Sequence, residues 1–446
     1  MNGFKETMYQ SFVDNNIIAP GYFEKYRVKR GLRNPDGTGV MAGVTNICNV
    51  HGYVLDDGEK KPAEGKLIFR GYNIKDLIGR AAAEDRFGFE EVVYLLLTGR
   101  LPNVDELEEF SQLLSENRTL PDYFFEDMIL KAPSRNIMNK MARSTLALYS
   151  YDDDPESLSP EHEIDTAISL IAKMPVIMIC AYETKRRYFG GKSMFVHPVI
   201  EGMSTAENIL STLRPDRKFT YEEAKLLDLM LMLHAEHGGG NNSTFSCRVL
   251  TSSGTDPYSA YAAAIGSLKG ARHGGANHKV SEMHEYIKKN VKDWENDDEL
   301  ADYLKKILNK EAGDGSGLIY GMGHAVYTLS DPRAVILKEY AGKMAKGTEF
   351  EKEYKLLESI ERLTPEIFEN EKHSGKVMCA NIDMYSGFVY RMLGIPHDIF
   401  TPLFAVSRMA GWCAHRFEEM NSGKRIIRPA YKNVLHEKKY VDLKDR

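Results

Sequence analysis

The sequence predicts a mostly α-helical protein that carries one small β-hairpin. Apolar residues recur with helical periodicity over long stretches, whereas alternating strand patterns are scarce. At 446 residues the chain is long enough for two to three domain-sized units and a sizeable core. Its composition, with 43% apolar, 27% charged and 10% aromatic residues, is typical of an ordinary globular enzyme.

The hairpin is expected within residues 44–72, near the N-terminus. There "YVLDDGEKK" supplies an Asp-Gly turn before the strand-like "GKLIFRGY". The next segment, "FEEVVYLLLTGRLP", predicts a helix that stops at a glycine followed by a proline. The acidic "YDDDPESLSPEHE" at 151–163 predicts a loop.

The middle of the chain is expected to be helical throughout. The longest apolar stretch, "AISLIAKMPVIMICA", is short and interrupted by Lys173 and Pro175, which favours a buried core helix over a membrane span. Thr220 and Glu223 form a capping box at the start of "TYEEAKLLDLMLML". "PYSAYAAAIGSLKG" is rich in small residues, so we expect a helix that a neighbour can approach closely. "NDDELADYLKKILNK" has an amphipathic pattern, and "AGDGSGLIYGMG" at 312–323 predicts a loop.

Charge and cysteine content exclude several classes of protein. A net charge of −6 argues against a partner such as nucleic acid or a membrane surface, and the short basic "YRVKRGLR" predicts a solvated segment. The five cysteines are scattered and form no C-x-x-C pair, so neither a zinc ribbon nor a disulfide framework is indicated. The first residues lack the apolar core of a signal peptide, so we expect a cytoplasmic protein.

Four patches place polar residues inside apolar surroundings. They are "LHAEHGGGNNSTF" (233–245), "GARHGGANHKV" (270–280), "GMGHAVYTLSDPR" (321–333) and "CANIDMYSG" (379–387). His237, His273 and His324 each adjoin a glycine, which lets backbone and ligand approach closely. A single histidine beside glycine is more often structural than catalytic, but three such sites in one chain weaken that interpretation.

Three other chemistries fit these patches less well. A metal site would use His234 and His237 with Glu236 between them, but the H-E-x-x-H order and a third ligand are missing. A dinucleotide site would need a third glycine and a preceding strand in "GMGHAV". "HGGGN" is similar to an esterase oxyanion loop, but no serine lies in a G-x-S-x-G elbow.

Asp383 lies between apolar runs in "ANIDMYSGFVY". An aspartate there must be paired, cap the helix that "FVYRML" predicts, or be functional. Partial desolvation would raise its basicity, which suits a general base acting on a weak carbon acid.

Together with "AVSRMAG" and "IIRP", these motifs resemble citrate synthase in their order and spacing, over roughly residues 40–435. "GKLIFRGYNIKDL" and "FEEVVYLLLTGRLPN" look like that family's N-terminal segments. The resemblance implies a two-domain, all-α homodimer. Residues 1–275 and 389–446 would form its large domain, and residues 276–388 its small domain on the CoA side.

The implied enzyme is an acyltransferase of the citrate (Si)-synthase type, at the entry to the tricarboxylic acid cycle. It would condense acetyl-CoA with oxaloacetate and water through an enol or enolate and a citryl-CoA intermediate, without a metal or other cofactor. By the motif match, Asp383 would deprotonate the acetyl methyl group, His273 would hydrogen-bond the thioester oxygen, and His324 would polarise the oxaloacetate ketone. The residues implied to hold the oxaloacetate carboxylates are His237, Arg333, Arg408 and, from the partner subunit, Arg428. Those implied to contact CoA are Gly321, Gly323 and Asn381.

The chemistry is consistent with these residue types. A dianionic substrate requires guanidinium forks, and a carboxylate base needs donors at the thioester oxygen, where charge develops. Two positions depart from the family pattern: Arg272, where leucine is frequent, and Thr328, where many members have a basic residue that meets a CoA phosphate. A 2-methylcitrate synthase acting on propionyl-CoA is the nearest alternative. A non-catalytic CoA-binding homologue and a metal-dependent hydrolase are more distant ones.

Overall fold

The computed structural model describes residues 3–34, 37–56, 59–373 and 377–446. It divides into two units: Val44–Ile426, which we call the main unit, and a terminal unit of Met1–Gly43 and Ile427–Arg446. Each unit is described by itself.

The terminal unit consists of short helices and extended chain. Its helical segments are α1 (Gly3–Asn15), α2 (Gly21–Lys25), η1 (Arg30–Leu32) and η5 (Leu443–Asp445), and none of them contains a buried residue. Large apolar side chains are exposed at both ends of the chain, including Phe4 at 73%, Phe12 at 68% and Tyr431 at 94%. The basic segment 26–33 is exposed, as predicted.

The main unit opens with a small antiparallel sheet in the order β1-β2-β3. Its strands are β1 (Cys48–Asp56), β2 (Glu59–Phe69) and β3 (Tyr72–Asn73). Cys48 pairs with Phe69, and the register shifts between His51 and Tyr53. The hairpin is therefore confirmed, and the third, two-residue strand was not predicted. The Asp-Gly turn at 57–58 lies outside the described residues.

Helices make up most of the rest of the main unit. In chain order they are α3 (Ile74–Ala83), α4 (Phe89–Thr98), α5 (Val104–Glu116), η2 (Phe125–Leu130), α6 (Ile137–Leu148), η3 (Tyr149–Tyr151), α7 (Pro160–Gly190), α8 (Thr205–Leu213), α9 (Tyr221–His234), α10 (Asn242–Thr251), α11 (Pro257–Leu268), α12 (Ala276–Asn290), α13 (Asp297–Leu308), α14 (Pro332–Ala345), α15 (Glu351–Lys372), α16 (Asp383–Met392), η4 (His397–Ile399) and α17 (Phe400–Ser422). A mostly α-helical protein with a small N-terminal sheet is thus confirmed.

Most of the local predictions are confirmed. Thr220 and Glu223 form both bonds of the capping box at α9, and α4 ends at Gly99 in the left-handed conformation (φ 84°). The loop predicted at 151–163 is too long, because α7 already begins at Pro160. Ser159 caps that helix by accepting the backbone N–H of His162, and proline suits its first turn.

Helix α7 contains the longest apolar stretch, with Pro175 inside it. Among the described residues it is the one helix long and apolar enough to cross a membrane, but 72% of its apolar window is buried inside the protein. That burial agrees with the predicted core helix.

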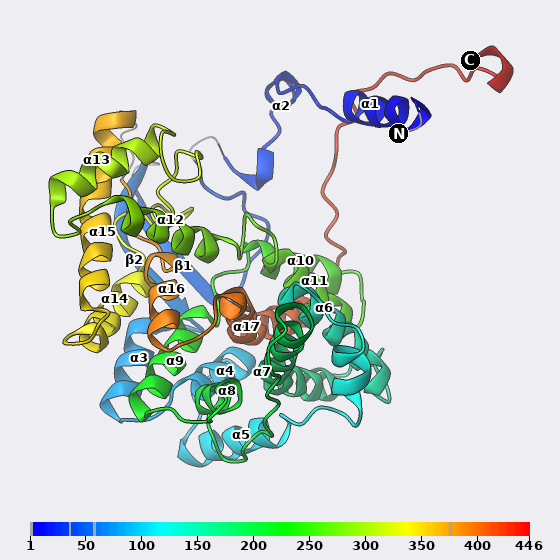
Figure 1. Cartoon of the computed structure of the whole chain (residues 1–446). Helices are drawn as coiled ribbons and strands as arrows, with labels where there is room; N and C mark the ends of the chain where they lie inside the picture. Colours follow the sequence, from blue (N-terminus) through cyan, green and yellow to red (C-terminus); the bar gives the residue numbers. More distant parts are fainter. Residues whose placement is uncertain (1–2, 35–36, 57–58, 374–376) are drawn as a thin grey trace. The chain divides into compact units, whose positions relative to one another are not determined.

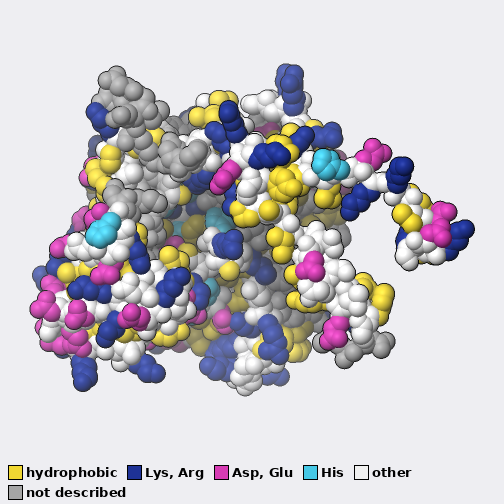
Figure 2. Space-filling view, turned by 90° about the horizontal axis from the view of Figure 1, so that it is seen from above, with side chains coloured by type: hydrophobic (Ala, Val, Ile, Leu, Met, Phe, Trp, Pro, Cys, Tyr) yellow, Lys and Arg dark blue, Asp and Glu magenta, His cyan; other side chains and the backbone are white. Residues whose placement is uncertain are grey.

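The charged side chains do not gather into one basic surface on the face seen in Figure 2. Acidic and basic side chains are interspersed over that face.

Two groups of helices are visible in the main unit (Figure 1). In the first, α13 packs on α15, and α16 contacts both α12 and α14, which also contacts β2. In the second, α17 is central and packs on α4, α7, α9, α10 and α11. Helix α17 is buried along most of its length, so a polar residue in its middle must be paired or functional.

Candidate active site

A cavity of about 160 Å³ in the main unit brings the polar patches together. Its lining includes the predicted residues His237, His273, His324, Arg333, Asn381, Asp383 and Arg408. Arg428 belongs to the terminal unit and is not among the lining residues.

A short backbone bridge joins the loop that carries His324 to the segment before α16, the helix that begins at Asp383. Met322 and Ala380 form an isolated antiparallel bridge, next to which Gly323 N–H donates to Cys379 O at 2.7 Å. The Asn381 side chain extends this bridge, because its Nδ2 donates to Gly323 O and its Oδ1 accepts the Asp383 N–H. His324 and Asp383 are therefore held together although they are distant in sequence.

Gly321 and Gly323 have structural roles in this bridge. Both adopt positive φ (84° and 86°), and a Cβ on Gly321 would lie 3.1 Å from the Met384 backbone. Since the Asn381 amide is also engaged within the fold, local structure accounts for all three residues. Their contact with CoA stays a prediction.

The tautomer of His324 is fixed by its own loop. Its Nδ1 accepts the backbone N–H groups of Val326 and Tyr327, each at 3.0 Å. A nitrogen that accepts cannot carry the proton, so the proton is on Nε2 and that atom is a donor. The loop thus provides a hydrogen-bond donor of the kind that polarises a carbonyl.

The β-hairpin packs directly against this loop. A Cβ on Gly52 would lie 2.6 Å from Tyr327 Cα, and one on Gly65 would lie 2.1 Å from Ser330 O. Thr328 Oγ1 donates to Gly52 O and accepts the Ala63 N–H at 3.3 Å. The Thr328 hydroxyl is therefore bound to the hairpin.

Arg333 lines the cavity but already has a carboxylate partner. Its Nε and Nη2 donate to Asp331 at 3.0 and 2.7 Å, and both residues are buried. Although burial acts to raise the pKa of Asp331, Arg333 holds it below its usual value. Asp331 also accepts the N–H of Arg333 as the cap of α14. The ion pair fixes the orientation of the guanidinium, and its predicted contact with oxaloacetate stays a prediction.

Arg408 is the most unusual charge in the site. It is 0% exposed, its Nε donates to His234 O at 2.7 Å, and its Nη1 and Nη2 are buried without a hydrogen-bond partner. Burial lowers the pKa of its guanidinium to about 10. A buried donor without a hydrogen-bond partner lowers the stability of the folded protein. Two parallel N–H groups of a guanidinium can donate to the two oxygens of one carboxylate, so a bound carboxylate would supply the missing partners of Arg408.

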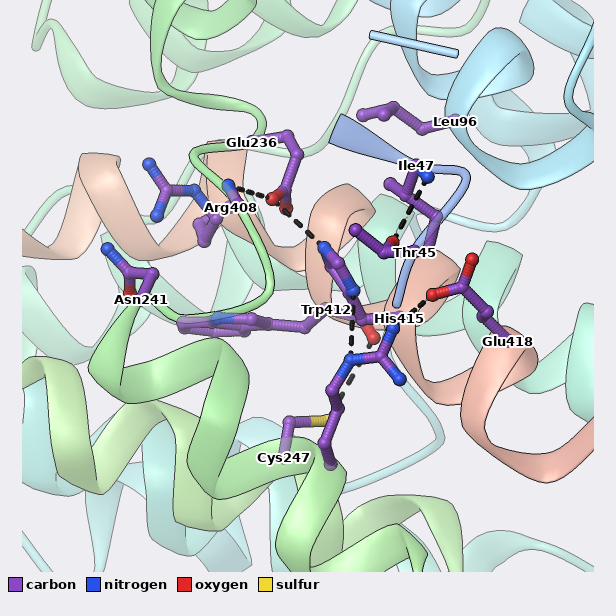
Figure 3. A network of polar contacts seen from close by, with 12 residues as sticks. Thr45, Ile47, Leu96, Glu236, Asn241, Cys247, Arg408, Trp412, His415 and Glu418 are labelled. Carbon is purple, nitrogen blue, oxygen red and sulfur yellow. Dashed lines mark hydrogen bonds and ion pairs between the residues drawn. The ribbon is translucent and has the colours of Figure 1, made fainter. Parts of the chain in front are cut away.

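A buried polar network lies beside Arg408 (Figure 3). Arg248 Nε donates to His415 Nδ1 at 3.1 Å, which places the remaining proton on His415 Nε2, facing Glu236 Oε1 at 3.0 Å. Burial acts to raise the pKa of Glu236, but His415 and Arg408 hold it below its usual value. Glu236 also accepts the Gly238 N–H, so it fixes the turn that carries His237.

The histidines at the end of α9 are both neutral. Burial lowers the pKa of His234 to about 3, and its Nδ1 donates to Met230 O at 2.9 Å. Burial and Arg333 hold the pKa of His237 well below its usual value. His237 Nε2 is buried without a partner, and its ring lies edge-on to His324 at 5.2 Å between centroids. A neutral imidazole here can position a ligand without adding charge.

His273 faces the cavity from the loop between α11 and α12. Its Nε2 lies 3.2 Å from Ser243 Oγ, and burial lowers its pKa to about 4. Ser243 Oγ accepts the Trp412 Nε1–H at 3.2 Å and donates its own proton to Asn241 Oδ1 at 2.9 Å. Because this proton goes to Asn241, the Nε2–H of His273 donates to Ser243 Oγ; a hydroxyl turned to His273 would instead leave the imidazole proton on Nδ1.

Asp383 begins α16, where its side chain lines the cavity. Burial raises its pKa to about 6, against the opposing effect of Arg333. The predicted rise in basicity therefore has the predicted cause. A carboxylate of this basicity remains ionised at neutral pH and is a better base than an exposed aspartate.

Several residues of the site were missed from the sequence. Asp331 had a local signal, because "DPR" places a capping aspartate before a proline. No local signal marks Ser243, Asn277 or the ionic role of Glu236, because these residues bond to Trp412, Ser386 and His415, which are far away in the chain. Within the described parts of the chain, no group of three or more His, Cys, Asp or Glu side chains is arranged to hold a metal ion.

Comparison with known proteins agrees with this geometry. The family model described as citrate synthase, C-terminal domain, matches residues 34–430. Citrate synthase 2 of Bacillus subtilis is 36% identical over 414 residues, which cover 92% of this chain and 98% of that protein. The 2-methylcitrate synthase 1 of Corynebacterium glutamicum is 30% identical over 427 residues, which cover 94% of this chain and 99% of that protein.

A solved structure has the same fold. It is the citrate synthase of Thermoplasma acidophilum in a ternary complex with carboxymethyl coenzyme A and oxaloacetate. It superposes with a TM-score of 0.74 at 26% identity, covering 94% of this chain and 99% of that one. The family match and these similarities extend over nearly the whole chain, so the chain belongs to the citrate synthase family of acyltransferases.

Proposed function

We propose that this chain condenses acetyl-CoA with oxaloacetate and water to give citrate and CoA, using the cavity around Asp383. The observation that carries the proposal is Arg408, whose two buried N–H groups lack a partner. Uncompensated buried donors of this kind are explained if a ligand carboxylate completes them. Oxaloacetate has two carboxylates and a ketone, which match the cationic and neutral donors of the cavity.

Oxaloacetate binds first. One carboxylate pairs with Arg408, and His237 and Arg333 contribute to holding the dianion. The Nε2–H of His324 donates to the ketone oxygen, so charge that develops there meets a fixed donor. The two groups of helices then close over oxaloacetate as large and small domains, with residues 276–388 as the small domain. Closure excludes water and completes the acetyl-CoA site.

Asp383 next removes a proton from the acetyl methyl group of acetyl-CoA. The electrons of that C–H bond move onto the thioester oxygen, which His273 stabilises by donating from Nδ1. This requires that the Ser243 hydroxyl turn away from Asn241 Oδ1, to which it donates at 2.9 Å, and donate to His273 Nε2 across the 3.2 Å contact. The enol or enolate carbon attacks the oxaloacetate ketone, and His324 protonates the new alkoxide. Water then hydrolyses citryl-CoA to citrate and CoA.

The assembly that we propose is a cytoplasmic homodimer. Exposed apolar side chains at both ends of the chain, such as Phe4 and Tyr431, support burial against a second copy. Arg428 would enter the partner subunit's site and pair with the second carboxylate. All groups that the proposed steps need are side chains, so we propose that no metal or redox cofactor takes part.

The test is thiol release from acetyl-CoA and from propionyl-CoA, each with and without oxaloacetate. We expect release to depend on oxaloacetate and to be faster with acetyl-CoA. Faster turnover of propionyl-CoA would favour the 2-methylcitrate reaction, for which the 30% identical relative is the reason to test. No release with either thioester would refute the proposed activity.

A further inference from the structure

We propose that Asn277 is a positioning residue that orients the Asp383 carboxylate through its side-chain amide, with Ser386 as its anchor. This inference rests on the proposed function, because it concerns the base of the same reaction. Asn277 lies in the first turn of α12 and is 7% exposed, with its side chain at the cavity wall.

The first argument is the packing of α12 on α16. Asn277 Nδ2 donates to Ser386 Oγ, which is completely buried. Ser386 follows Asp383 by three residues on α16, so both side chains lie on the same face of that helix. An amide nitrogen that is bonded to Ser386 is therefore next to the carboxylate, and it has a second N–H to donate.

The second argument is the space that Gly387 leaves. A Cβ at that position would lie 2.7 Å from Ser281 Oγ and 3.0 Å from Asn277 Oδ1. A larger residue would therefore crowd the side chains of both Ser281 and Asn277. The absence of a side chain thus allows the close approach on which the contact depends.

The third argument concerns the orientation of the amide. Asn277 Oδ1 is buried without a partner, on the same side as the equally unpartnered Ser281 Oγ, one turn along α12. The opposite orientation would turn this oxygen toward the Asp383 carboxylate, where two acceptors would repel. With the nitrogen toward Asp383, the hydroxyl of Ser281 can rotate to donate to Oδ1.

The fourth argument is the balance of groups that act on Asp383. Burial and the Asp331 charge raise its pKa, whereas the Arg333 charge and the Asn277 hydrogen bond lower it. Arg333 is already paired with Asp331. A neutral donor can fix the direction of a carboxylate without the full loss of basicity that a second cation would cause. Asn277 supplies that donor.

The experiment compares the pH profiles of kcat/KM for acetyl-CoA in wild type and Asn277→Ala. Loss of the donor should move the acid limb to higher pH by about half a unit or more, and lower kcat at neutral pH by roughly tenfold. The Kd of oxaloacetate, measured without acetyl-CoA, should change by less than about twofold. Ser386→Ala should produce a smaller change in the same direction.

The matched control is Asn208→Ala, which removes another buried asparagine that donates to a backbone carbonyl, Ile200 O, outside the cavity. It should leave the acid limb in place even if it lowers the melting temperature. An active Asn277→Ala with an unmoved acid limb would overturn the inference. If Asn277→Ala does not fold, Asn277→Leu, which keeps a similar volume but has no donor, is measured by the same criterion of a shifted limb. Failure of the wild type to release CoA would instead refute the proposed function.

Discussion

Replacing Arg408 with leucine is the sharpest perturbation of the proposed oxaloacetate site. Its Nη1 and Nη2 are buried and unpaired, so a bound carboxylate would gain two charge-assisted hydrogen bonds. At about 1.5–3 kcal/mol for each bond, the loss is about 3–6 kcal/mol. That corresponds to a factor of about 10² to 10⁴ in the Kd of oxaloacetate.

The assay is isothermal titration of oxaloacetate into the protein without acetyl-CoA, supported by the rise in melting temperature that oxaloacetate causes. Arg408→Lys should lie between wild type and Arg408→Leu, because it retains the charge but loses the planar fork. Arg214→Leu is the control, since Arg214 is outside the cavity and paired with Glu223 at 2.6 Å. A change of less than about fivefold in Arg408→Leu would refute the reasoning.

Three further predictions test neighbouring parts of the account. Gly65→Ala should lower the free energy of unfolding by about 1–3 kcal/mol and reduce kcat, because its Cβ would lie 2.1 Å from Ser330 O. The control Gly79→Ala, which has open space around it, should not be destabilised. Equal melting temperatures of the two variants would contradict the prediction. Burial raises the pKa of Asp383 to about 6, so ionising this carboxylate lowers the free energy of unfolding as pH rises from about 4 to 6. Asp383→Asn should therefore raise the melting temperature at pH 7.5 but not at pH 4. A lower melting temperature of this variant at pH 7.5 would contradict the raised pKa. Co-expression of Asp383→Ala with Arg428→Ala chains, each inactive alone, should restore roughly a quarter of wild-type activity if Arg428 acts on the partner's site; no recovery, with heterodimers confirmed by mass, would exclude it.

The features that could be predicted from sequence are those whose causes are local. The capping box of Thr220 and Glu223 involves residues three apart, and the helix periodicity of "NDDELADYLKKILNK" gives α13 directly. The start of α7 was missed although Ser159 and Pro160 are a local signal, because the acidic run before them favoured a loop.

The features that could not be predicted depend on distant contacts. Ser243 is understood only through Trp412, which is 169 residues away, and the burial of Arg408 depends on the helices that surround α17. Likewise, the structural role of Thr328 depends on a distant contact, because its hydroxyl donates to Gly52 O in the hairpin, 276 residues away. Motif resemblance located the residues of the cavity, whereas their protonation and pairing required the fold.

The central claim is that Asp383 is the base that starts the condensation, and Asp383→Ala tests it most directly. Turnover should be measured as CoA release from acetyl-CoA with saturating oxaloacetate, beside the Kd of oxaloacetate for the same variant. The account predicts that kcat falls on the order of a hundredfold or more while the Kd of oxaloacetate stays within about threefold of wild type. Near-normal turnover in a folded Asp383→Ala protein would contradict it.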